Sequence, residues 1–165
     1  MKRKSLSVTK KTLNFYQTKL KDSQVKKLYS LFSNNLASLN LTNKKIMVGV
    51  SGGADSLAVL FFSQCYALKH HTKLYPVIID HKLRKESTIE AKNLKYKLKQ
   101  NFKINCKILS KKIVKINNNI QSYARDLRYD LFFEECNKQK IDYLILGHHK
   151  DDLIENFFIR FLRGS

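Results

Sequence analysis

The chain has 165 residues, of which 43% are hydrophobic, and this length and composition are typical of one globular domain with its own core. Thirty-two basic residues stand against thirteen acidic ones, giving a formal net charge of +19. Such a charge favours a polyanionic partner, either nucleic acid or an anionic membrane surface. A lysine-rich codon bias would also explain much of the lysine count, so charge alone is a weak argument for RNA.

The cysteines and the apolar runs exclude several classes of protein. Cys65, Cys106 and Cys136 form no CxxC pair, so we expect neither a zinc nor an iron–sulfur site. Separate thiols fit a reducing cytoplasm. No apolar run approaches the ~20 residues that a membrane span needs. We therefore predict a cytoplasmic protein that does not act at a membrane.

Residues 1–45 are strongly basic, with eleven Lys or Arg residues and one acid, Asp22. Apolar residues recur there at helical spacing. These positions are Leu28, Leu31, Phe32 and Leu36. The pattern predicts a basic tail followed by one or two helices, and we treat it as a unit separate from a second unit at residues 46–165.

From residue 46 onward, short apolar runs alternate with helical patterns. The predicted strands are 46–50, 74–79, 104–109 and 143–146, and the predicted helices are 56–70, 87–101, 119–138 and one beginning near 151. Continuous apolar strands indicate a sheet that is covered on both faces. The alternation predicts an α/β fold with a doubly wound parallel sheet and helices on both faces. Ligands of such sheets bind at the carboxyl ends of the strands.

A glycine-rich loop follows the first predicted strand, and three of the chain's five glycines lie in or beside it. Its residues are Ser51, Gly52, Gly53, Ala54, Asp55 and Ser56. Glycines let the backbone approach a ligand closely, and the first N–H groups of the following helix can bind an anion. A carboxylate at Asp55 suits such a site when a cation lies between it and a phosphate, which indicates a magnesium–nucleotide complex. The alternative is a tight turn in which Asp55 and Ser56 cap the helix.

The C-terminal stretch GHHKDDLIENFFIRFLRGS places polar residues after the fourth predicted strand. Asp152 and Glu155 share one helical face, and carboxylates at a helix start suit the positive end of the helix dipole. Gly147 and His148 follow a strand, as do Asp80 and His81. One crevice is therefore expected to gather both pairs and the glycine loop. The alternatives are an N-cap at Asp151 with ordinary loop histidines, or a metal site that lacks a third firm ligand.

Four motifs in order resemble one family. SGGADS at 51–56 is similar to the pyrophosphate loop of the N-type ATP pyrophosphatases. DHKLRKES at 80–87, YARDLRY at 123–129 and the stretch from 147 resemble motifs of one branch, the tRNA(Ile)-lysidine synthetases. The resemblance covers residues 46–165 and implies an adenine nucleotide alpha-hydrolase-like, Rossmann-like fold. Residues 1–45 carry no such resemblance.

The resemblance implies an ATP-dependent ligase that uses ATP and Mg²⁺. It would join free L-lysine to C2 of the wobble cytidine of the CAU-anticodon isoleucine tRNA, through an adenylated tRNA, releasing AMP and pyrophosphate. Residues 51–56 would hold the pyrophosphate portion. Asp55 and Asp152 would bind Mg²⁺, and His148 would contact the α-phosphate or the reacting oxygen.

Arg128 is a further catalytic candidate beside Asp55, His148 and Asp152, and four other residues are candidates for a substrate pocket. Arg125 and Arg128 lie three apart and would steady phosphate or the transition state. Their alternative is a solvated charged helix face. Asp80 and Arg84, with Glu155, are expected to line a substrate pocket, although for Asp80 and Arg84 a plain charged turn is nearly as good an explanation.

The chain departs from the family pattern in two ways. Asn156 stands where the family has Thr, which preserves hydrogen bonding. Family members continue past the RGS at 163–165, so we expect a C-terminally incomplete catalytic domain that is inactive or very poor alone. The competing hypotheses are another enzyme with this loop, such as a tRNA thiolase or an amidotransferase-type synthetase, and a nucleotide- or RNA-binding remnant. The cytidine thiolases carry paired cysteines near the loop, whereas this chain has only Cys65 there.

Overall fold

Residues 10–84, 86–111 and 120–147 are described in this computed structural model. Four strands form one sheet in which all neighbours run parallel, in the order β3-β2-β1-β4. The strands are β1 (Lys45–Gly49), β2 (Lys73–Asp80), β3 (Lys107–Ser110) and β4 (Tyr143–Leu146). The predicted parallel sheet is therefore confirmed. The helix expected from residue 151 lies outside the described residues.

One predicted strand begins later than expected. The apolar pattern places the third strand at 104–109, whereas β3 begins at Lys107. The preceding helix ends with Lys103 in a left-handed conformation (φ 56°), and the N–H of Ile104 donates to the carbonyl of Leu98. Ile104 is buried as part of this helix end rather than in the sheet.

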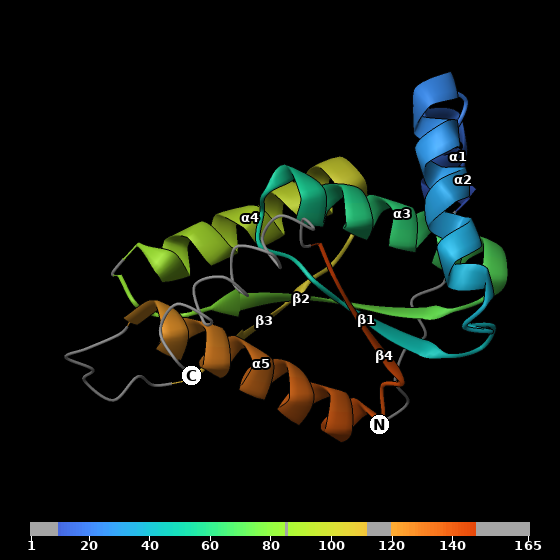
Figure 1. The fold of residues 1–165 in the computed structure, drawn as a ribbon. Coiled ribbons are helices and arrows are strands. Elements are labelled where there is room, and N and C mark those ends of the chain that lie inside the picture. Colours follow the sequence, from blue (N-terminus) through green and yellow to red (C-terminus); the bar gives the residue numbers. More distant parts are fainter. Residues whose placement is uncertain (1–9, 85, 112–119, 148–165) are drawn as a thin grey trace, which may run out of the picture.

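Helices cover both faces of the sheet. They are α1 (Lys10–Lys19), α2 (Ser23–Ala37), α3 (Ala54–His70), α4 (Ser87–Phe102) and α5 (Ile120–Gln139). In Figure 1, α3 and α4 lie on one side of the strands and α5 lies on the other. This is the doubly wound arrangement that the alternating pattern predicts. No helix in the described ranges is both long and apolar enough to cross a bilayer.

Alternate residues of β1 supply two separate cores. Ile46 and Val48 belong to the larger core, which includes Leu60 of α3 and Leu98 of α4. Met47 points the other way and packs with Phe132 of α5. Because successive strand side chains point to opposite faces, a strand between two helical layers must be apolar at every position. This explains the continuous apolar run.

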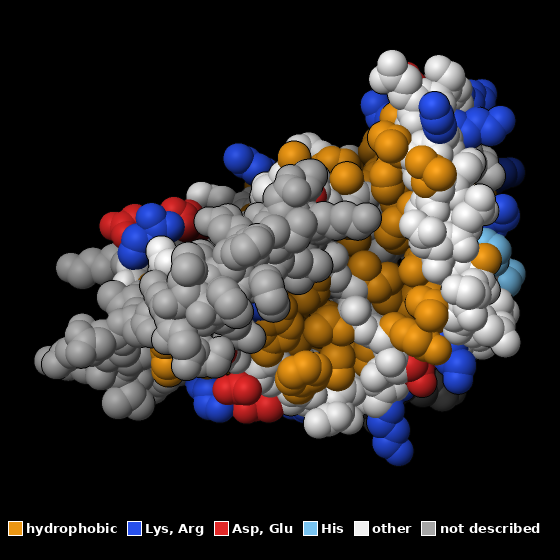
Figure 2. Space-filling view, viewed as in Figure 1, with side chains coloured by type: hydrophobic (Ala, Val, Ile, Leu, Met, Phe, Trp, Pro, Cys, Tyr) orange, Lys and Arg blue, Asp and Glu red, His pale blue; other side chains and the backbone are white. Residues whose placement is uncertain are grey.

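The two N-terminal helices pack against α3 and extend the larger core. Tyr16 of α1 is buried, its hydroxyl donates to the carbonyl of Phe102, and its ring lies 5.3 Å from that of Phe61. The side chain of Asp22 caps α2 by accepting from two backbone N–H groups. Figure 2 shows Lys side chains on the end of the α1–α2 pair. The two helices are thus confirmed, and their outer surface is basic.

The strand order places a topological switch point between β1 and β4. From β1 the chain crosses to β2 on one side, whereas β4 joins β1 on the other. Connections therefore leave neighbouring strands in opposite directions at this point. In open α/β sheets, ligands bind beside the carboxyl ends of the strands at such a switch point. The glycine loop follows β1, and Gly147 follows β4.

Candidate functional site

The glycine loop is organised by the hydroxyl of Ser56. Its Oγ accepts hydrogen bonds from the N–H groups of Ser51 (3.3 Å) and Gly52 (3.2 Å) and lies 3.0 Å from the Oγ of Ser51. The same hydroxyl donates to the carbonyl of Gly53 at 2.9 Å. Ser56 is only 3% exposed. One buried side chain thus holds the whole turn in a single conformation.

The two loop glycines have different reasons to be glycine. Gly52 has φ 93°, which L side chains rarely adopt, and a Cβ there would lie 3.2 Å from Leu94. Gly53 has an extended backbone (φ −70°) and serves as the N-cap of α3 without a side-chain bond. A Cβ on Gly53 would have its nearest contact 3.7 Å away, at Ser51 Oγ. The fold itself therefore leaves room for a side chain at Gly53, where two features favour glycine: its N-cap position and the space it leaves for a ligand to approach the loop.

Asp55 and Ser56 do not act as simple helix caps. The cap position is Gly53, and Asp55 lies in the first turn of α3, where its negative charge suits the helix dipole. Asp55 is exposed and borders the pocket described next. The first-turn N–H groups of an α-helix have no carbonyl four residues earlier to bind, so the loop offers donors to an anion.

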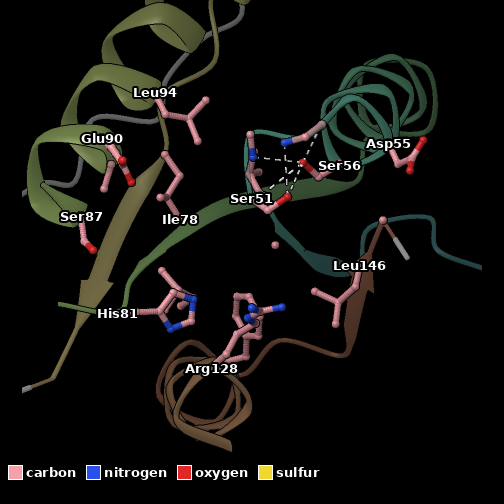
Figure 3. A pocket seen from close by; sticks show the side chains of 18 of the residues that line it. Ser51, Asp55, Ser56, Ile78, His81, Ser87, Glu90, Leu94, Arg128 and Leu146 are labelled. Atoms are coloured by element: carbon pink, nitrogen blue, oxygen red, sulfur yellow. Dashed lines mark hydrogen bonds between the residues drawn. The ribbon is translucent and has the colours of Figure 1, made fainter. Parts of the chain in front are cut away.

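A pocket of about 600 Å³ lies at the carboxyl ends of the strands. Three walls come from the glycine loop, from the end of β2 with the first turns of α4, and from α5 (Figure 3). Its volume falls in the range usual for small-molecule sites, about 300–1,000 Å³. Apolar residues at Ile78, Leu94 and Phe132 alternate with polar groups around it. The loop, His81 and Gly147 of the predicted crevice all line this pocket, whereas Asp80, which the prediction also placed there, does not, and His148 lies outside the described residues.

Arg128 and His81 meet on the wall opposite the loop. Arg128 rises from α5 and His81 follows β2, and Figure 3 shows their side chains next to each other. Burial, and then the nearby charge of Arg128, lower the pKa of His81. Burial also lowers the pKa of Arg128, and Arg125 acts in the same direction. Two basic groups thus share one partly buried wall.

Of the other candidates from the sequence, Arg84 lines the pocket, whereas Asp80 and Arg125 do not. Asp80 is buried, and its carboxylate accepts from the N–H of Lys82 (3.0 Å) and the hydroxyl of Thr88 (2.6 Å). It fixes the turn after β2 and is not among the lining residues. Arg84 does line the pocket and pairs with Glu90 at 3.3 Å, both well exposed. Arg125 lies over the ring of Tyr129, 5.9 Å from its centroid, and does not line the pocket.

Gly147 joins the end of β4 to the glycine loop. A Cβ there would lie 2.8 Å from the Cα and the N of Ser56 and 3.0 Å from the carbonyl carbon of Asp55. The two backbones are in direct contact. The candidates that come after it in the sequence, His148, Asp152 and Glu155, lie outside the described residues.

Sequence reasoning assigned no role to several pocket residues. His81, Ser87, Glu90 and Leu94 line the wall formed by β2 and α4. His81 and Ser87 belong to the DHKLRKES motif, which was the available signal. Glu90 and Leu94 follow Ser87 at helical spacing, so the helix pattern could have placed them on the same face.

Comparison with known proteins identifies the class. A family described as the PP-loop domain matches residues 20–165. The chain therefore belongs to the PP-loop domain family. A solved structure of the U34-tRNA thiolase NcsA from Methanococcus maripaludis, with its [4Fe-4S] cluster, has the same fold. The match has a TM-score of 0.67 and 21% sequence identity, and it covers 85% of this chain and 52% of the thiolase.

Curated relatives carry one name. A tRNA(Ile)-lysidine synthase of Orientia tsutsugamushi (strain Boryong) is 42% identical over 123 residues, covering 74% of this chain and 28% of the relative. A tRNA(Ile)-lysidine synthase of Rickettsia rickettsii (strain Sheila Smith) is 37% identical over 144 residues, covering 84% and 29%. The chain thus spans less than a third of the length of these relatives.

Proposed function

We propose that this chain is the ATP-binding part of a tRNA(Ile)-lysidine synthetase. The observation that carries the proposal is the ordered PP-loop at a switch-point pocket, in a chain whose curated relatives bear that name. The substrates would be ATP, free L-lysine and the isoleucine tRNA with a CAU anticodon. A cytoplasmic location goes with these substrates and is part of the proposal.

The proposed reaction has two steps that exchange one bond at a time. The C2 oxygen of the wobble cytidine attacks the α-phosphorus of ATP, and the bond to the β-phosphate oxygen breaks to release pyrophosphate. The ε-amine of lysine then attacks C2 and loses a proton, and the C2–O bond breaks to release AMP. Both steps develop negative charge on phosphate oxygens, which fixed donors and cations stabilise.

Residues in the described part of the chain would bind the pyrophosphate portion and stabilise the negative charge on the phosphate. The loop from Ser51 to Ser56 would hold the pyrophosphate portion with its hydroxyls and with backbone donors at the start of α3. Arg128 would stabilise charge on the phosphate, because it faces the same pocket from the opposite wall. Arg84 and Glu90 are candidates for a substrate contact at the rim, whereas Arg125 and Asp80 would support their neighbours.

Magnesium fits the described part of this site. Asp55 presents a carboxylate at the pocket rim beside the phosphate-binding loop, and Mg²⁺ is often bound by one or two carboxylates together with substrate phosphates. Asp152 would be the second ligand. When bound, the ion would offset the charge of the leaving pyrophosphate. His148 near the reacting oxygen and Glu155 in the substrate pocket complete the proposal by resemblance to the family motif.

A thiolase is the second candidate enzyme, but the site does not favour it. None of the described pocket residues is a cysteine. Cys65 and Cys106 are buried in the larger core, away from the lining. Within the described ranges, no group of three or more His, Cys, Asp or Glu residues is placed to hold a metal ion. The described part of the pocket therefore offers no thiolate for such a reaction.

The proposal is tested by following radiolabelled lysine into tRNA. A protein of the length of the relatives, with this chain as its N-terminal part, should label CAU-anticodon isoleucine tRNA in the presence of ATP and should not label an unrelated tRNA. The 165-residue chain alone should give little or no product. Failure of the longer protein to label any tRNA, while it still binds ATP, would contradict the assignment.

A further inference from the structure

We propose that His81 and Arg128 together form a second anion site, which holds one phosphate group across the pocket from the glycine loop. This inference rests on the proposed function, because it refines how the same pocket holds its substrates. It adds His81, which the motif comparison left without a role. The ligand chemistry is a phosphate, supplied either by the nucleotide or by the RNA backbone.

Arg128 is a partly buried cation that pairs with no acidic residue in the described part of the chain. Within the described ranges its guanidinium has no ion pair and no hydrogen-bond partner. Two carboxylates near this wall have other partners: Asp80 accepts from the backbone N–H of Lys82 and the hydroxyl of Thr88, and Glu90 pairs with Arg84. A partly buried charge normally has a partner, because removal from water is costly. An anionic ligand is a suitable partner for this wall.

The ring of His81 is the second group of this site. Its Nδ1 atom is buried and makes no hydrogen bond to any described residue, whereas its Nε2 atom is not buried and is the ring nitrogen that a ligand in the pocket can reach. The ring lies beside Arg128 on the pocket wall (Figure 3). The protonated form of a histidine next to an arginine is unfavourable by itself and becomes favourable once a negative charge lies between the two groups. The same phosphate would therefore satisfy both groups.

Donors around the pocket lie on two separate walls. The glycine loop offers one anion site on the β1–α3 wall, and the His81–Arg128 pair offers another on the wall of β2 and α5. Two separated sites suit a chain of phosphates, or one phosphate from each of two substrates. Arginine binds phosphate through paired N–H groups, and a histidine beside it adds one directional donor.

Binding should be accompanied by uptake of a proton. Without ligand, burial and the charge of Arg128 keep His81 neutral near pH 7, since its pKa is lowered. A phosphate beside the ring would raise that pKa, so the complex would hold an extra proton. The charged groups that act on the ring are Arg128 from α5 and Asp80 from β2, and Arg84, Glu90 and Asp55 also line the pocket.

The test uses calorimetric titration of the full chain with three probes: α,β-methylene-ATP with Mg²⁺, pyrophosphate with Mg²⁺, and tRNA. The variants are His81→Asn and Arg128→Gln. His71→Asn is the matched control, because His71 is an exposed histidine at the far end of α3 whose left-handed backbone (φ 54°) suits asparagine. Titration in two buffers of different ionisation enthalpy measures proton uptake. A thermal melt shows whether each variant folds. If His81→Asn does not fold, Arg128→Gln still tests the second anion site.

If the nucleotide supplies the phosphate, His81→Asn should weaken the ATP analogue about tenfold, as expected for a charge-assisted hydrogen bond. Proton uptake should disappear, and pyrophosphate affinity should stay within a factor of about two, because pyrophosphate needs only the loop. A loss confined to tRNA would identify an RNA phosphate instead. Unchanged affinity for all three probes in both variants would overturn the second site while leaving the nucleotide pocket intact. A wild-type chain that bound none of them would overturn this site and the proposed function together.

Discussion

Gly147 lies so close to Ser56 that an added Cβ would come within 2.8 Å of the Cα and the N of Ser56. These residues are 91 positions apart, and their backbones touch where β4 meets the first turn of α3. The contact sets the spacing between the glycine loop and the end of β4. It also makes the loop geometry sensitive to any side chain at 147, which leads to a first prediction.

Gly147→Ala should lower the free energy of unfolding by about 1–3 kcal/mol, because overpacking against a backbone cannot be relieved by a side-chain rotation. Gly53→Ala is the matched comparison. It should change the free energy of unfolding by less than about 1 kcal/mol, because the space is open and the smaller entropy of the unfolded chain is offset by the poor N-cap preference of alanine.

Urea unfolding measures both stabilities, and calorimetry measures ATP affinity. For Gly53→Ala we expect normal stability and weakened ATP binding, because the methyl group would stand where the phosphate approaches. A Gly53→Ala variant that bound ATP like the wild type would show that the ligand does not come close to this residue.

Ser56→Ala should be destabilising, whereas Ser63→Ala should not. Both serines lie on α3 and both are 3% exposed. The Oγ of Ser56 holds four groups of the loop, but that of Ser63 has no hydrogen-bond partner among the described residues. Removal of the Ser56 hydroxyl leaves its buried hydrogen-bond partners unpaired and should lower the free energy of unfolding by about 1–3 kcal/mol. Equal unfolding free energies for the two variants would contradict the role given to Ser56.

Asp55→Ala in a protein of the relatives' length should abolish ATP–pyrophosphate exchange and leave tRNA affinity largely intact. Asp55 is expected to meet the metal, whereas RNA affinity should come from dispersed lysines and arginines. Asp22→Ala is the control, because it removes a carboxylate that caps α2 far from the pocket. Exchange that fell by less than about tenfold, or ~1.4 kcal/mol, would rule out a metal ligand at Asp55.

The buried thiols should make the fold less stable in alkali. Burial raises the pKa of Cys65 and of Cys106 to about 12. In the unfolded chain a thiol ionises near pH ~8.5. Their contribution is therefore fully present below that pH and is lost as the pH rises from there towards 12. Urea titrations should show a nearly constant free energy of unfolding from about pH 7 to pH 8 and a falling one from about pH 9 to pH 11.

Thiol labelling gives an independent check on the same two residues. In a Cys136→Ala variant, Ellman's reagent should react slowly with the native chain at pH 8 and quickly with both remaining thiols in urea. Rapid reaction of the native variant would mean that Cys65 or Cys106 is accessible. This would contradict the structure, in which Cys65 is only 4% exposed and Cys106 only 2%.

RNA binding by the chain should be salt-sensitive and weakly specific. Its affinity for tRNA should fall by about 0.7–0.9 log units per phosphate contact for each log unit of salt. Replacing Lys10, Lys11, Lys26 and Lys27 with Gln should reduce this slope, because all four are exposed on the α1–α2 pair. Filter binding with isoleucine tRNA and an unrelated tRNA measures both slope and preference. A strong preference for the CAU anticodon would place the recognition surface within this chain.

Local pattern was sufficient to predict the sheet and its loop. A strand between two helical layers must be apolar on both faces, so residues 46–50 could be recognised without any partner. The glycine loop was visible because a left-handed backbone at residue 52 requires a residue such as glycine. The start of β3 was predicted too early, since Ile104 is buried by a helix end and apolar content does not distinguish that from a strand.

Only the tertiary structure could decide which residues share the pocket. Asp80 and His81 are neighbours in sequence, but successive side chains of a strand point in different directions. The side chain of Asp80 is therefore buried in the turn after β2, whereas that of His81 faces Arg128. Arg125 and Arg128 look equivalent on a helical wheel, yet only Arg128 lines the cavity. The need for glycine at 147 depends on contact with a residue 91 positions away. Sequence fixes the local conformations through propensity and periodicity, whereas such contacts depend on how the strands are ordered and how the helices pack on them.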